Sequence, residues 1–205
     1  MLIAPDAGRK RFATTSGGDG LVRFADFDAA LLIGLGWKVQ PLAAVRARYG
    51  LHGDPDAPAK RYLVSLAARR AALAGTYGSG LAMTVAGGMR HAVDIPVVLL
   101  TEPFVSEAIA DQPRLNGGLT DRHDQGLLTE YAALAADAKR SLDRFDILGQ
   151  PATTHDGLFS HAWCEAGGVE IGGRGQIAAR SDHRHMGPAY GALALRTGLE
   201  RLAGL

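Results

Sequence analysis

An acidic side chain and two imidazoles lie close together near the carboxyl end of the chain, where residues 181–188 read Ser-Asp-His-Arg-His-Met-Gly-Pro. An Asp three residues before a His can hold the imidazole in one tautomer and stabilise its cation after it has taken a proton from a nucleophile. Asp182 and His185 are therefore the candidate acid/base pair. The alternative is that Asp182 caps the last helix and that His183 and His185 are solvated.

Four other side chains are candidates for the attacking group. Ser16 lies in a glycine-rich stretch near the amino end, without the strand and helix that a nucleophile elbow needs. Ser160 and Ser181 are expected to be loop or capping serines. Cys164, the single cysteine, is either a thiolate activated by a neighbouring His or a small buried hydrophobe. One cysteine excludes an internal disulfide and a cysteine-rich zinc site.

A metal site is a further alternative, because several imidazoles and carboxylates in the last third of the chain could converge: His155, Asp156, His161, Glu165, His183 and His185. Such side chains suit zinc or iron, but their spacing matches no familiar ligand motif. We therefore expect no metal and no cofactor. The glycines of residues 167–175 precede neither Lys-Ser/Thr nor a helix, which favours a hairpin or mobile loop over the site rather than a phosphate loop.

The composition is that of a single soluble globular domain covering residues 1–205, with residues 1–20 as a loop-like lead-in. The chain is 47% hydrophobic and 21% charged, and its net charge is +1. Because the arginines are scattered, we expect no nucleic-acid partner. The longest apolar run, Ala29 to Leu35, is far shorter than the roughly 18 residues of a membrane span, and no signal-peptide pattern opens the chain. We expect a cytoplasmic protein with no membrane partner, and its oligomeric state stays open.

Apolar runs and helical patterns alternate along the chain. Continuous apolar runs predict buried strands over residues 29–36, 95–101 and 145–148. Helices are predicted over about 41–48, 59–74, 127–144 and 190–202, whereas residues 82–86 fit a strand or a helix start. This order predicts an open, mostly parallel α/β sheet of three layers. Ligands of such sheets gather beyond the carboxyl ends of the strands, so the loops there are candidate sites.

The motifs together resemble those of the SGNH (GDSL-like) hydrolases. Asp182 and His185, followed by Gly187, Tyr190 and a small-residue helix, are similar to the last block of that superfamily. The strands over residues 26–36, 95–103 and 145–151 resemble, in order, its third block, the next strand and the strand before the acid/base block. The resemblance covers roughly residues 21–205 and implies a flavodoxin-like fold.

The resemblance also implies a reaction. His185 would be the general base and then the general acid, Asp182 would orient it, and Gly34 or Gly36 would lie in the oxyanion region. The expected substrate is a small-molecule or glycan ester, with an acetyl ester of a carbohydrate favoured by analogy.

Two blocks of the superfamily differ here. The sequence contains no Gly-Asp-Ser, which supplies the attacking serine in members, so Ser16 is the one weak candidate. The third block, usually Gly-x-Asn-Asp, reads Gly34-Leu35-Gly36-Trp37, which leaves the Gly36 N–H as a replacement donor. Either a segment carrying the serine precedes this sequence, or the domain is a degenerate relative. The alternative function is therefore an inactive domain that binds a glycan or a protein partner.

Overall fold

The computed structural model describes residues 23–52, 62–165, 170–171, 176–177 and 186–205. The described residues combine five α-helices with small, mostly parallel sheets, which confirms the predicted α/β class. The helices are α2 (Gln40–Arg48), α3 (Leu66–Gly78), α4 (Leu81–Ala92), α5 (Gln125–Arg140) and α6 (Pro188–Ala203). Within this part of the chain, no helix is both long and apolar enough to cross a bilayer.

The main sheet has three parallel strands in the order β1-β4-β5, and they coincide with the three predicted apolar runs. The strands are β1 (Ala30–Ile33), β4 (Val97–Leu100) and β5 (Phe145–Leu148). All four residues of β4 are buried, as expected for a central strand. The prediction that the first run is buried on both faces is wrong, because Ile33 is 60% exposed. Among the described strands β1 pairs with β4 alone, so it lies at an edge.

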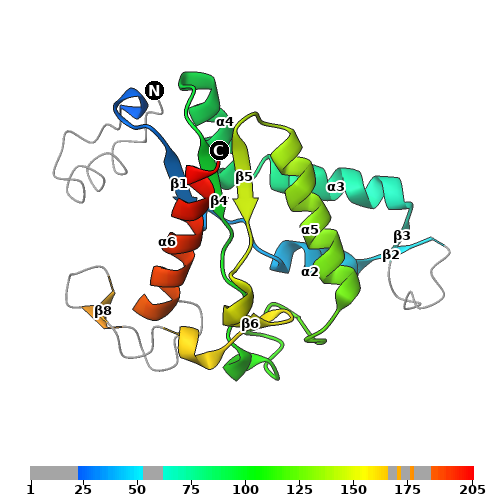
Figure 1. Cartoon of the computed structure of the whole chain (residues 1–205). Coiled ribbons are helices and arrows are strands. Elements are labelled where there is room, and N and C mark those ends of the chain that lie inside the picture. The colour runs from blue at the N-terminus through cyan, green and yellow to red at the C-terminus, as the bar shows by residue number, and fades with distance from the viewer. Residues whose placement is uncertain (1–22, 53–61, 166–169, 172–175, 178–185) are drawn as a thin grey trace.

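Helices pack on both faces of this sheet (Figure 1). One face contributes Val98 and Leu100 to a cluster with Tyr190 and Ala194 of α6. The other face contributes Val97, Leu99 and Phe145 to the larger core, which α2, α3, α4 and α5 complete. The alternation follows from the strand geometry, in which successive side chains point to opposite faces.

Helix α6 runs against the strand direction and extends past the carboxyl end of the sheet (Figure 1). Gly198 packs against the sheet so closely that a Cβ added there would lie 2.8 Å from Leu31 Cδ1 and 3.5 Å from Leu100 Cδ2. Leu100 is the last residue of β4, and Gly198 lies late in α6. The first turns of α6 therefore project beyond the carboxyl end of the sheet. The start of α6 therefore lies at the end of the sheet where the sequence predicts a site.

Local sequence explains where most helices begin. Pro41 stands in the first turn of α2, where its missing N–H has no helical partner to lose. Ser65 Oγ accepts from the Ala68 N–H at 3.1 Å, and Asp124 Oδ1 accepts from the Leu127 N–H at 2.8 Å. These side chains cap α3 and α5 by satisfying amides that the first helical turn leaves unpaired.

Two helix predictions need correction. The helix expected over residues 59–74 starts later, because Tyr62–Val64 form β3, which pairs in parallel with β2 (Tyr49–Leu51) before Ser65 caps α3. Tyr62 and Val64 are aromatic and β-branched residues, which favour strands. The helix expected over residues 127–144 ends at Arg140, and Arg144 has a φ of +48°, which no helix allows. The undecided segment 82–86 lies within α4.

The remaining elements are short. Two antiparallel pairs occur, β6 (His155–Asp156) with β7 (Phe159–Ser160) and β8 (Glu170–Ile171) with β9 (Gln176–Ile177). The second pair confirms the antiparallel pairing of the hairpin expected around residues 167–175. The 3-10 helices are η1 (Phe24–Asp26), η2 (Glu107–Ile109), η3 (Ala152–Thr154) and η4 (Ala162–Cys164).

Candidate functional site

The predicted acid/base pair lies outside the described residues, as do His183, Ser181 and Ser16. The roles of Asp182, His185 and Ser16 therefore stay predictions. The N-cap residue of α6 is Gly187. The alternative that Asp182 caps the region of this helix falls on a residue outside the described part of the chain.

The chain immediately after His185 is firmly held. Met186 forms an antiparallel bridge with Glu165, and the Gly187 N–H donates to the carbonyl oxygen of Cys164 at 2.7 Å. Met186 also packs against the cluster that contains Leu100. Because Met186 is the next residue after His185, these contacts fix where the candidate loop meets α6.

The loop after β1 turns sharply through three consecutive residues in the left-handed region. The φ angles of Gly34, Leu35 and Gly36 are +75°, +52° and +81°. Glycine adopts this conformation without steric cost, whereas Leu35 is strained by it. The turn directs the Gly36 N–H toward the loop that follows β4.

The side chain of Glu102 accepts a hydrogen bond from that N–H. The Gly36 amide donates to Glu102 Oε1 at 2.8 Å, and the Glu102 amide donates to the carbonyl oxygen of Trp37 at 2.8 Å. Lys38 Nζ lies 3.7 Å from Glu102 Oε2. Glu102 thus joins the loops after two neighbouring strands. Glu102 is not among the site residues predicted from the sequence, although its position just past the end of β4 was a usable signal.

These contacts bear directly on the predicted oxyanion residues. The Gly34 N–H donates to the Leu100 carbonyl oxygen at 2.9 Å, continuing the strand pairing, so it is already used. The Gly36 N–H reaches a negatively charged oxygen, as an oxyanion donor must, but that oxygen belongs to Glu102. An acyl oxyanion could use the same N–H only after the Glu102 carboxylate had moved aside.

The loop after β5 is organised by a buried polar network around Gln150. Gln150 Oε1 accepts from the Phe104 N–H at 2.7 Å, and Gln150 Nε2 donates to Ser160 Oγ at 2.8 Å. The Ser160 hydroxyl donates to the Phe104 carbonyl oxygen at 2.6 Å and is fully buried. Ser160 therefore supports the backbone from within β7, rather than as the loop or capping serine that the sequence predicts.

Cys164 is a buried thiol. Its side chain has no solvent exposure, and its Sγ donates to the Thr154 carbonyl oxygen at 3.4 Å. Burial, helped by the nearby carboxylates of Glu107 and Glu165, raises the pKa of the thiol to about 11. Since the thiolate is the nucleophilic form, the thiol-nucleophile alternative is wrong and the buried-hydrophobe interpretation is confirmed.

A cluster of charges lies around Arg122, whose Nη1 is 3.4 Å from Glu107 Oε2 and 3.3 Å from Asp156 Oδ2. His161 Nδ1 lies 3.7 Å from the same Glu107 oxygen. A hydrogen bond from the Ala162 amide, together with Arg122 and His161, lowers the pKa of Glu107 despite partial burial. Glu107 is thus an ionised anchor for η4.

The predicted metal ligands do not converge as far as the structure describes them. His155 Nδ1 contacts the Gly157 carbonyl oxygen at 2.9 Å, while His161 faces Glu107. Among the described residues, no group of three or more His, Cys, Asp or Glu side chains could hold a metal ion. His183 and His185 lie outside that part of the chain.

Comparisons of this chain with protein-family models, with curated proteins and with solved structures found no match. The resemblance to SGNH hydrolases therefore stays a prediction from the sequence motifs.

Proposed function

We propose that this chain is an SGNH-like hydrolase domain that cleaves an acyl ester by Ser-His-Asp-type acyl transfer. An acetyl ester of a carbohydrate is the favoured substrate class. The proposal includes a flavodoxin-like, three-layer domain, and the packing of α6 on one sheet face and of α4 and α5 on the other supports it.

One observation carries the proposal. Met186, the residue after His185, is anchored to Glu165 and packs in the cluster of Leu100, at the entry to a helix that projects beyond the carboxyl end of the sheet. The loop from Gly34 to Gly36 leaves β1 at the same end. An acid/base pair just before Met186 and an amide donor at Gly36 would therefore lie at the same end of the sheet, as acyl transfer requires.

In this reaction a serine hydroxyl attacks the ester carbonyl carbon and His185 takes its proton, while Asp182 orients the imidazole. The tetrahedral oxyanion accepts a hydrogen bond from the Gly36 N–H. His185 then donates the proton to the departing alkoxide, which leaves as the alcohol. In the second half of the reaction His185 takes a proton from water, the water attacks the acyl-serine, and His185 returns the proton to the serine oxygen as the acid departs. Ser16 is the candidate nucleophile in this sequence. Glu102 has to leave Gly36, and its existing ion pair with Lys38 can retain the carboxylate after that move.

The second candidate is an inactive domain that binds a glycan or a protein partner at this edge. The hydrogen bond from Gly36 to Glu102 favours it, because a carboxylate stands where the oxyanion would form. The absence of Gly-Asp-Ser from the sequence points the same way.

Ester hydrolysis separates the two candidates. The wild-type chain should hydrolyse p-nitrophenyl acetate, and His185→Ala should abolish the hydrolysis while His183→Ala does not. Equal rates for the wild type and His185→Ala would reject the hydrolase and leave the binding domain.

A further inference from the structure

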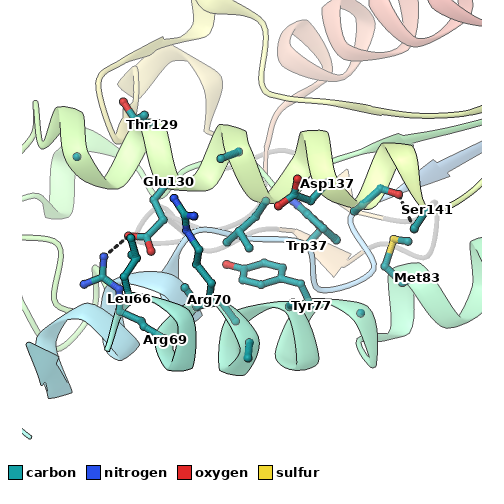
Figure 2. Close-up of a pocket in the computed structure, with 18 of the residues that line it drawn as sticks. Trp37, Leu66, Arg69, Arg70, Tyr77, Met83, Thr129, Glu130, Asp137 and Ser141 are labelled. Atoms are coloured by element: carbon teal, nitrogen blue, oxygen red, sulfur yellow. Dashed lines mark hydrogen bonds and ion pairs between the residues drawn. The ribbon is translucent and has the colours of Figure 1, made fainter. Parts of the chain in front are cut away.

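A long groove separates α3 from α5 on the side of the molecule opposite α6 (Figures 1 and 2). Its volume is about 1010 Å³. One end lies between Leu66 and Gln125, and the other between Met83 and Ser141. The 13 residues of α3 make the groove roughly 20 Å long at 1.5 Å per residue.

The floor of the groove is apolar and firmly built. Trp37 is 1% exposed, and its ring centroid lies 4.8 Å from that of Tyr77. The Tyr77 hydroxyl donates to the Lys38 carbonyl oxygen at 2.6 Å, and Leu73 is fully buried beside them. Small residues line the walls: Ala71, Ala74, Gly78, Gly126, Ala133 and Ala138. The groove is therefore open because the side chains along its walls are short, and its floor is held in place by packing and a hydrogen bond.

Both arginines that line the groove lie at one end with Glu130, whereas Asp137 and Ser141 lie toward Met83. Figure 2 shows Arg69, Arg70 and Glu130 together near Leu66, away from Met83. Arg69 Nη2 lies 3.1 Å from Glu130 Oε2, and both side chains are largely buried. Arg70 adds a second guanidinium without a second carboxylate at that end. Asp137, further along α5, pairs with Arg140.

Two buried donors of the groove residues lack an acceptor. Trp37 Nε1 and Arg69 Nε have no hydrogen-bond partner in the described part of the chain. Arg69 uses Nη2 toward Glu130 while its Nε lacks an acceptor, so this end of the groove keeps donor capacity for an anion. An apolar floor with surplus positive charge at one end suits an amphiphile whose head is an anion.

We propose that the groove between α3 and α5 binds a long-chain carboxylate of the fatty-acid class. The hydrocarbon chain lies against Ala71, Ala74 and Leu134, above the buried layer of Trp37, Leu73 and Tyr77. The carboxylate lies beside Arg69 and Arg70. The length of the groove is comparable with that of an extended palmitate. Binding removes the chain from water and gives the guanidinium groups an anionic acceptor. This inference does not rest on the proposed hydrolase activity.

Tryptophan fluorescence can test the site, because the protein has two tryptophans and the other one, Trp163, is 50% exposed. In a Trp163→Phe background, Trp37 alone reports on the floor. Sodium myristate, kept below its micelle-forming concentration, should change this fluorescence with saturation at one molecule per chain. Methyl myristate should bind at least about tenfold more weakly, because it lacks the charge. Arg70→Gln should weaken myristate binding by about tenfold and leave methyl myristate unaffected.

A matched pair of variants locates the chain of the ligand. Ala74→Phe fills the groove and should abolish binding, whereas Ala72→Phe, on the same helix but not lining the groove, should leave it unchanged. Ala133→Phe, on α5, repeats the block from the other wall if Ala74→Phe does not fold.

Several results would overturn the inference. Myristate that does not saturate, or that binds equally to the blocked and control variants, would remove the site. Equal affinity for the ester and the acid would remove the carboxylate assignment. A dimer that light scattering detects in the Trp163→Phe protein and that Ala74→Phe dissociates would assign the groove to a second copy of the chain.

Discussion

The amide of Gly36 donates a hydrogen bond of 2.8 Å to the carboxylate of Glu102, joining the loops that follow β1 and β4. A turn of three left-handed residues, strained at Leu35, presents the amide, and Lys38 lies beside the carboxylate. The contact shows that the Gly36 N–H is placed to bind an anionic oxygen. It also means that the proposed reaction competes with a resident carboxylate.

Replacing Glu102 tests that competition. Glu102→Ala should raise the rate of p-nitrophenyl acetate hydrolysis by about tenfold or more, since one oxyanion donor is worth about a hundredfold to a thousandfold. It should also lower the free energy of unfolding by about 1 kcal/mol, because a partly exposed charged hydrogen bond is lost. Denaturant unfolding and initial rates check both effects. Unchanged or lower hydrolysis in a folded variant would argue against Gly36 as the donor.

His185 and His183 provide the sharpest comparison for the acid/base pair. His185→Ala should reduce the hydrolysis of p-nitrophenyl acetate by about three to four orders of magnitude, because the general base is removed. His183→Ala is the matched control and should retain the wild-type rate. A similar loss in both variants would indicate a general effect on the loop rather than a role of His185.

Asp146 predicts how stability depends on pH. This buried carboxylate of β5 accepts from the Ile147 amide at 2.9 Å and pairs with Lys139 Nζ at 3.0 Å and with Arg201. Burial alone would raise the pKa of Asp146, but these partners outweigh it, so the pKa lies below its ordinary value of 3.8. A depressed carboxyl pKa adds stability above the ordinary value, which is lost as the pH falls through the folded-state value.

The melting temperature of the wild type should therefore fall as the pH is lowered below about 4. Asp146→Asn should lower the free energy of unfolding by about 1–2 kcal/mol at pH 7, because Lys139 and Arg201 lose their ionised partner but, at 44% and 40% exposure, stay hydrated. Its melting temperature should also fall less steeply with decreasing pH than that of the wild type. Thermal unfolding followed by circular dichroism from pH 7 to pH 2.5 measures both. If the melting temperatures of the two proteins fall equally with decreasing pH, Asp146 is not the source of the acid destabilisation.

The close approach of α6 to the sheet depends on Gly198. Gly198→Ala would place a Cβ 2.8 Å from Leu31 Cδ1, so Leu31 must shift, and we expect a loss of about 1–2 kcal/mol. Gly191 is the matched control in the same helix, since a Cβ there has no neighbour within 4 Å. Gly191→Ala should stabilise the protein by about 0.5–1 kcal/mol through its higher helix propensity. Equal effects at both positions would contradict the packing of α6 described above.

Cys164 should behave as an inert thiol. Because its pKa is raised to about 11 and the side chain is fully buried, reaction with a disulfide reagent at pH 8 should be at least about a hundredfold slower than in denaturant. Cys164→Ala should retain any esterase activity. Rapid labelling of the folded protein would show that the η4 region opens readily.

Short-range patterns determined much of the fold. The runs Val97–Leu100 and Phe145–Leu148 became strands, and Pro41, Ser65 and Asp124 start helices, because strand burial and helix capping act over a few neighbouring residues. The errors occur at boundaries, as at Tyr62–Val64, where residues assigned to the start of a helix pair with β2 instead.

Only the tertiary structure decided the contacts between distant segments. Gly36 and Glu102 are 66 positions apart, and no local pattern indicates that the carboxylate would take the amide. The groove between α3 and α5 likewise arises because two helices place alanines and glycines over Trp37. Such contacts depend on how whole elements pack, and helix packing is set by side-chain volumes on both partners together rather than by either sequence segment alone.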